Sequence, residues 1–222
     1  MNYCAMSGAL TPLARIEALT GLIPHLAGDE KSVVISQALD AASATTDDRR
    51  TEALIFVIPH LTGYKKSAVI SQAMTAVHAI TDPLSRARAY TLLAGCLPAD
   101  QQPAVITQAL TAVSTITDDS RAGTLTLLSP CLSADHLADA IKMAPRGSAD
   151  PLMTLMERAK SVLAPGDEAT LLSLLRSAFD GSGRRACFGI IQAAAPLIAR
   201  IGGTAAIQEC VKAIEDVHQW WP

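Results

Sequence analysis

Histidine and cysteine recur at one position of a repeated segment, and they are the first candidates for chemistry. These residues are His25, His60, Cys96 and Cys131, and each is followed by a leucine. Two imidazoles and two thiols are ligand types of structural zinc sites. Stacked helices, however, lie about 8–10 Å apart, whereas zinc holds its ligands at about 2.0–2.3 Å. The repeat spacing therefore disfavours a shared metal, and we predict that these side chains fill the seam between repeats.

A second group contains residue types used in general acid–base catalysis. Asp135, His136 and Asp139 lie just before Ala144-Pro145-Arg146-Gly147, where the repeat is interrupted. One hypothesis is therefore a helical-repeat enzyme, lyase- or glycosylase-like, with its site in a concave groove near residues 135–150. The sequence shows no GxSxG, HExxH or dinucleotide-binding glycine motif. We favour a function without catalysis, and predict no catalytic residue, no metal site and no cofactor.

Both groups belong to an internal repeat, which determines where their side chains can lie. The segment VVISQALDAASATTD at 33–47 returns as AVISQAMTAVHAITD at 68–82 and as AVITQALTAVSTITD at 104–118. A second segment begins at Arg15, Arg50, Arg86 and Arg121, with spacings of 35, 36 and 35 residues. Both segments have apolar residues at helical spacing. Each repeat is therefore predicted to be a helix pair, which buries its apolar faces only when copies stack.

The repeats predict an all-α fold, a right-handed α-solenoid of about six stacked antiparallel helix pairs. We expect a single helical-repeat domain over residues 1–222. Regular repeats cover 12–132, and diverged repeats with a C-terminal cap cover 133–222. Gly202-Gly203 is predicted to part the last two helices. Aromatic residues are only 4% of the chain, so small and aliphatic side chains must form the core and allow helices to approach closely.

Helix ends are marked by recurring Pro and Asp residues. Pro24, Pro59 and Pro130 fall near the end of the first helix, where they limit its last turn. Asp82-Pro83 is suited to the start of the next helix, because Asp caps free N–H groups and Pro fits the first turn. The arginines that begin the first helices have two interpretations, an anion-binding strip or ion pairs with the preceding Asp residues. We favour the ion pairs, since i,i+3 pairs are routine in a first turn.

The second helices have a polar stripe that varies while the apolar positions stay constant. Its members share one face at spacings of three and four residues. They are Ser36, Asp40, Ser43, Ser71, Thr75, His78, Thr107, Thr111 and Ser114. An ordinary solvated face is the alternative interpretation. We predict that the stripe lines the concave side and binds a protein or peptide.

The repeat unit also resembles a known class of helical repeats. The pattern Arg-x-x-Ala-Leu-x-x-Leu-x-Pro-x-Leu, followed by a helix and Asp-Asp, is similar to HEAT-like and tetratricopeptide-like repeats. The closing "APLI…IGG…AI…DV…WWP" resembles the C-terminal sensor repeats of bacterial signal-transduction (STAND-type) NTPases. The resemblance implies a sensor or adaptor part of a bacterial signalling or defence system, fused to or assembling with an NTPase or protease module. This chain differs in having no Gly-x4-Gly-Lys-Ser/Thr loop.

Composition narrows the classes of partner. The formal net charge is −3, whereas a nucleic-acid binder usually has a strong basic excess. No cationic start precedes an apolar run, and no uninterrupted apolar stretch of about 18 residues occurs, so neither a signal peptide nor a membrane span is expected. The five cysteines are scattered along the chain. This spacing favours free thiols in a reducing compartment over a set of disulfides. The sequence thus predicts a cytoplasmic protein- or peptide-binding module, without membrane contact and with nucleic acid disfavoured.

Overall fold

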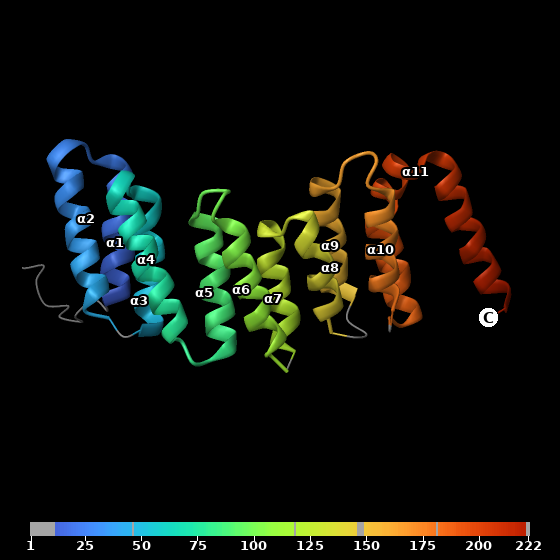
Figure 1. Cartoon of the computed structure of the whole chain (residues 1–222), viewed down its shortest axis with the longest axis horizontal. Coiled ribbons are helices and arrows are strands. Elements are labelled where there is room, and N and C mark those ends of the chain that lie inside the picture. The colour runs from blue at the N-terminus through green and yellow to red at the C-terminus, as the bar shows by residue number, and fades with distance from the viewer. Residues whose placement is uncertain (1–11, 46, 118, 146–148, 181, 221–222) are drawn as a thin grey trace, which may run out of the picture. The chain divides into compact units, whose positions relative to one another are not determined.

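All regular structure in the described part of the chain is helical (Figure 1). The computed structural model describes residues 12–45, 47–117, 119–145, 149–180 and 182–220, and no strand occurs among them. The predicted all-α class is therefore confirmed. The chain divides into two compact units, residues 1–105 and 106–222, with the boundary inside helix α6 (Gln102–Ser114).

The first unit contains two helix pairs that pack on each other and one further helix. Its helices are α1 (Pro12–Leu22), α2 (Gly28–Ser43), α3 (Asp47–Val57), α4 (Gly63–Ala79) and α5 (Pro83–Cys96). Helix α1 packs on α2, and α3 packs on α1, α2 and α4, while α5 contacts α3 and α4. The interior is aliphatic, and Ile16, Leu54 and Leu93 are almost fully buried. The apolar faces of these helices are therefore buried against neighbouring helices.

The second unit is organised around helix α9 (Ala149–Val162). Its other helices are α7 (Ser120–Leu128), α8 (Ala134–Met143), α10 (Glu168–Phe179) and α11 (Arg184–Trp220). Helix α9 contacts α7, α8 and α11, and α10 contacts α8 and α11. Leu155 and Met156 of α9 have no exposed surface. The core of this unit therefore runs through the middle of α9.

The Pro, Asp and Gly residues predicted to mark helix ends lie at helix ends in the structure. Pro24, Pro59 and Pro130 lie in single 3₁₀ turns that end α1, α3 and α7, namely η1 (Ile23–His25), η2 (Ile58–His60) and η3 (Ser129–Cys131). Asp82 caps α5, because the Ser85 N–H donates to its Oδ2 at 2.8 Å. The hydrogen bonds from Ser85 lower the pKa of this carboxyl. Gly63 starts α4 with φ +55°, a conformation that favours glycine.

Helix α11 is broken at Gly203. This residue has φ 67° and ψ −168°, which are not helical values. We call residues 184–202 the first arm and residues 204–220 the second arm. In Figure 1 the second arm turns away from the first and runs toward the C-terminus. Gly202-Gly203 thus does separate two helical segments. Among residues 204–216 of the second arm no side chain is buried, so this part of the second arm is packed less closely than the first arm.

One helical stretch passes a length and composition test for crossing a membrane. It spans Ala186–Asp216 and is 31 residues long. The first arm packs on α9 and buries Ile190, Ala194 and Leu197, as a core helix of a soluble protein also does. The non-helical backbone of Gly203 lies within the same stretch.

Candidate functional site

The residues of the polar stripe are exposed in both units. All nine members are exposed: Ser36, Asp40 and Ser43 on α2, Ser71, Thr75 and His78 on α4, and Thr107, Thr111 and Ser114 on α6. The buried residues of α4, by contrast, include Val69, Ala73 and Val77. The helical period therefore separates core and stripe as predicted.

Most hydroxyls of the stripe donate to their own helix. Thr75 Oγ1 donates to the Ser71 carbonyl at 3.0 Å, and Thr111 Oγ1 donates to the Thr107 carbonyl at 2.9 Å. Ser43 and Ser71 donate in the same way to carbonyls four residues earlier. A hydroxyl has one proton and two lone pairs. The stripe therefore presents mainly hydrogen-bond acceptors to solvent, because most of its hydroxyl protons are already donated to backbone carbonyls.

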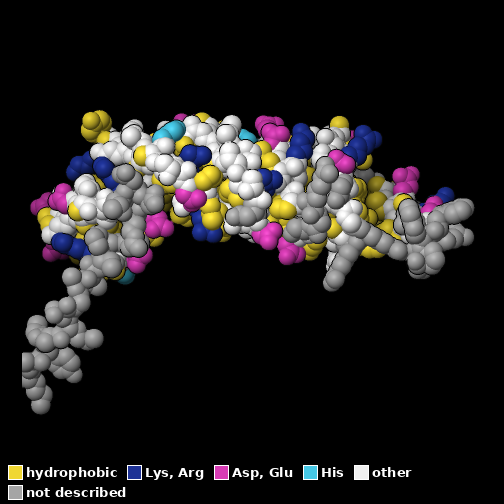
Figure 2. Space-filling model, turned by 90° about the horizontal axis from the view of Figure 1, so that it is seen from below, with side chains coloured by type: hydrophobic (Ala, Val, Ile, Leu, Met, Phe, Trp, Pro, Cys, Tyr) yellow, Lys and Arg dark blue, Asp and Glu magenta, His cyan; other side chains and the backbone are white. Residues whose placement is uncertain are grey.

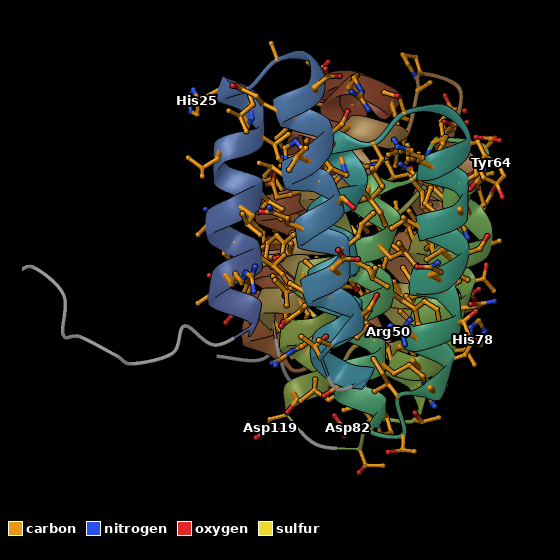
Figure 3. All side chains as sticks on the ribbon, turned by 90° about the vertical axis from the view of Figure 1, so that its left-hand side faces the viewer. His25, Arg50, Tyr64, His78, Asp82 and Asp119 are labelled. Carbon is orange, nitrogen blue, oxygen red and sulfur yellow. The ribbon has the colours of Figure 1, made fainter. Side chains whose placement is uncertain are left out.

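His78 is the largest stripe side chain, and its ring is fixed from two directions. Its Nδ1–H donates to the Met74 carbonyl at 2.6 Å. The ring also meets Tyr90 edge-to-face, with centroids 5.8 Å apart and planes at 87°. Burial raises the pKa of Tyr90. Figure 3 shows His78 and Tyr64 on one side of α4, away from His25. The imidazole thus projects from α4 into solvent in a defined orientation.

In the second unit, His136 of α8 approaches the stripe residue Thr107. The Thr107 hydroxyl lies 3.4 Å from His136 Nε2, and the Ser133 hydroxyl lies 2.7 Å from Nδ1. Both ring nitrogens therefore face hydroxyl groups. Asp139 lies 3.6 Å from the Lys142 ammonium, with both side chains exposed. The structure thus places His136 against Thr107 of α6. Among the described contacts, none joins Asp135, His136 and Asp139 to one another.

A cavity of about 310 Å³ lies beside the interruption after α8. Its lining includes Lys142, Pro145, Ser177 and Asp180. The cavity adjoins part of the segment 135–150, but Asp135, His136 and Asp139 do not line it, and the catalytic groove stays a hypothesis. Residues 146–148 of that segment lie outside the described part of the chain.

The His and Cys ladder follows the ends of the first helices. His25 is exposed, whereas His60, Cys96 and Cys131 are half-buried. Among the described residues, no group of three or more His, Cys, Asp and Glu side chains is arranged to hold a metal ion. Cys96 Sγ lies 4.0 Å from the Ile55 carbonyl of the neighbouring repeat, so this residue lies in the seam between repeats. Burial raises the pKa of the Cys131 thiol, so the thiol form is favoured there.

The pKa of His60 should lie below its ordinary value of 6.5. Burial is the larger cause, and the positive charge of Lys31 is the second. An NMR titration of the imidazole should show this midpoint, and Lys31→Gln should move it upward by removing the second cause. The unfolded chain then binds the proton more readily than the folded chain. Stability should therefore fall as the pH drops through the region near and below 6.5. A midpoint above 6.5, or one that Lys31→Gln lowers, would contradict this assignment.

Two arginines of the ladder, Arg86 and Arg121, bind backbone carbonyls near helix ends, and the ion pairs that we favoured stay a prediction. Arg86 donates to the Ile80 carbonyl at 3.3 Å. Arg121 donates through Nε to the Ile116 carbonyl at 2.6 Å and through a terminal nitrogen to the Ser114 carbonyl at 3.4 Å. Carbonyls at a helix C-terminus have no partner within the helix. These arginines therefore cap the preceding helix. The side chains of Asp47 and Asp118 lie outside the described residues.

Arginines also bind backbone carbonyls in the second unit, where the sequence repeat has diverged. Arg158 of α9 donates to the Leu132 carbonyl at 2.8 Å. Arg200 of α11 donates to the Lys160 and Leu163 carbonyls at 3.0 and 2.5 Å. Arg50 differs, since its buried Nε has no hydrogen-bond partner among the described residues. Arg158 lies in the later part of α9 and Arg200 lies inside α11, so neither has the position near a helix start that marks the repeated arginines.

Exposed apolar side chains on the first helices were missed by the sequence reasoning. Phe56, Leu92 and Leu127 are 43%, 49% and 56% exposed, and all three lie six residues after the repeated Arg. Their apolar character made them resemble core positions. On the face shown in Figure 2, Lys and Arg side chains are interspersed with Asp and Glu among the described residues.

No protein-family model, curated protein or solved structure matches the chain.

Proposed function

We propose that the chain is a protein- or peptide-binding module whose helix pairs stack as a right-handed α-solenoid of the HEAT-like or tetratricopeptide-like kind. The main support is the polar stripe, which occupies equivalent exposed positions on α2, α4 and α6 while the core positions repeat. The pair-on-pair packing of α1 to α5 is consistent with such stacking. Second helices in such stacks line the concave side, so the stripe would face a bound partner.

The chemistry of the stripe suits an extended peptide. Its hydroxyl lone pairs point outward and can accept hydrogen bonds from the N–H groups of a partner backbone. Small side chains lose little conformational entropy when they are covered. His78 adds an oriented ring, and Asp40 adds one exposed carboxylate. These features favour recognition of a polar or basic segment over an apolar one. The module would serve as the sensor or adaptor part of a cytoplasmic signalling or defence assembly.

A peptide-display selection tests this proposal directly. Peptides selected on the wild-type protein should bind Thr75→Arg and Thr111→Arg about tenfold more weakly or worse. The reason is that a donor or acceptor of the peptide that is buried without its hydrogen-bond partner costs about 1–3 kcal/mol. The matched control is Thr126→Arg. Thr126 is an exposed threonine on the first helix α7, and it makes the same hydrogen bond to a carbonyl four residues earlier, at 3.0 Å.

The outcomes separate the stripe from the rest of the surface. Loss with the stripe variants but not with Thr126→Arg supports the proposal. Equal binding to all three variants would show that the stripe is an ordinary solvated face. Circular dichroism should show unchanged helicity in each variant, since all three positions are exposed.

A further inference from the structure

An apolar groove runs between α10 and the two arms of α11. One part has a volume of about 650 Å³ and is lined by Leu175, Phe179, Phe188, Ile191 and Ile214. A second part of about 390 Å³ continues it toward Gly202. Leu175, Ile198, Cys210 and Ala213 line both parts, so the two form one groove. Helix α10 forms one wall, the second arm forms the other, and the first arm forms the floor.

The second arm is amphipathic, and the described part of the chain covers its apolar face only in part. Ile207, Cys210, Val211 and Ile214 lie on adjoining positions of a helical surface. None of them is buried, and Val211 is 49% exposed. On the opposite wall Leu172 is 53% exposed. A helix with an apolar face this wide normally packs against another element. The groove therefore has room and apolar surface for one more helix.

The charges at the groove identify the kind of helix that fits. The two charged side chains that line it, among the described residues, are Glu168 on α10 and Glu209 on the second arm. Both are exposed. Glu215 and Asp216 add two more carboxylates on the second arm, where Lys212 is the sole cation within residues 204–216. An occupant with basic residues beside its apolar stripe would complement this acidic rim.

The same charges argue against two other occupants. A second copy of the chain would present Glu209 and Glu215 beside its own apolar face, so like charges would meet in a symmetric pair. A membrane surface attracts helices with a Lys- and Arg-rich polar face, whereas this arm is acidic. We propose that the groove binds a basic amphipathic helix from a partner protein. This surface is separate from the polar stripe, so either proposal can fail alone.

The dimensions set the probe. At about 1.5 Å per residue, the lining of α10 from Glu168 to Phe179 extends about 16 Å, which corresponds to three helical turns. The probes are labelled 16-residue helical peptides with Leu, Ile or Met anchors at i, i+3, i+4 and i+7 spacing and lysines beside them. In the paired control peptides, glutamate replaces each lysine. Fluorescence anisotropy should show at least tenfold tighter binding of the lysine peptides, with weaker binding as salt increases.

Two variants locate the binding. Leu172→Asp should weaken the best lysine peptide by about tenfold or more, since it places a charge in the apolar wall. Leu127→Asp is the matched control, because Leu127 is a similarly exposed leucine, 56% against 53%, on α7. The double variant Glu168→Lys/Glu209→Lys should abolish or invert the preference for the lysine peptides. Bound peptide should also slow alkylation of the groove thiol Cys210 and leave Cys131 unaffected.

Several results would overturn the proposal. If no peptide of the set binds, or the lysine and glutamate peptides bind equally, the groove does not select a basic helix. If sedimentation shows a dimer that Leu172→Asp dissociates, the occupant is a second copy. Retention on phosphatidylcholine/phosphatidylglycerol vesicles that Leu172→Asp abolishes would identify a lipid surface instead. Unchanged helicity by circular dichroism should accompany every variant, since the replaced side chains are exposed.

Discussion

Replacing Leu155 by alanine should lower the free energy of unfolding by about 3 kcal/mol, within the range of about 2–5 kcal/mol for buried leucines. Leu155 has no exposed surface. It lies in the middle of α9, the helix that contacts α7, α8 and α11. Helices on several sides restrict how far the site can collapse around the missing atoms, so most of the cavity should remain. Chemical denaturation followed by circular dichroism measures the change.

The control for this experiment is an exposed leucine of the same unit. Leu127→Ala on α7, where the side chain is 56% exposed, should change stability by less than about 1 kcal/mol. The difference between the two leucines reports burial rather than helix propensity, since both replacements are Leu to Ala. If Leu155→Ala costs no more than Leu127→Ala, α9 is not the centre of the second unit.

The helix pairs could be predicted from the sequence because the signals that define them are local. Apolar residues at helical spacing, Pro24 and Pro59 at the ends, and the Asp82 cap act within one or two turns. The structure confirms each of them. Repetition strengthened the prediction, since a pattern seen three times is rarely accidental. The exposure of the stripe followed in the same way, because burial on one helix face requires exposure on the other.

The features that the sequence did not predict depend on residues far apart in the chain. Arg200 caps the carbonyl of Leu163, 37 positions away, and no local pattern indicates such a pair. The groove likewise depends on how α11 bends at Gly203. Gly202-Gly203 indicated a break, but a break alone does not specify the angle between two arms. The structure directs Arg86 and Arg121 to carbonyl oxygens, which the sequence spacing did not indicate, and the ion pairs with the preceding Asp residues stay a prediction.

Replacing Arg121 by alanine should lower the free energy of unfolding by about 2 kcal/mol, since a hydrogen bond to a charged group contributes about 1.5–3 kcal/mol. The variant loses both contacts at the end of α6, with the carbonyls of Ser114 and Ile116. Arg121→Lys should restore less than half of this loss, because an ammonium cannot reproduce the planar fork. Arg88→Ala, at an exposed position of α5, is the control and should change stability by less than about 0.5 kcal/mol.

Salt distinguishes carbonyl capping from the ion pair suggested by the sequence. Exposed ion pairs weaken strongly as the screening length falls to about 3 Å at 1 M salt. A half-buried hydrogen bond between a guanidinium and a carbonyl should change little, since its acceptor bears no net charge. The difference in stability between wild type and Arg121→Ala should therefore persist in 1 M NaCl. If it disappears, Arg121 acts mainly through the neighbouring carboxylates. The caps formed by Arg86, Arg158 and Arg200 would then need the same test, because these three arginines also donate to backbone carbonyls near helix ends.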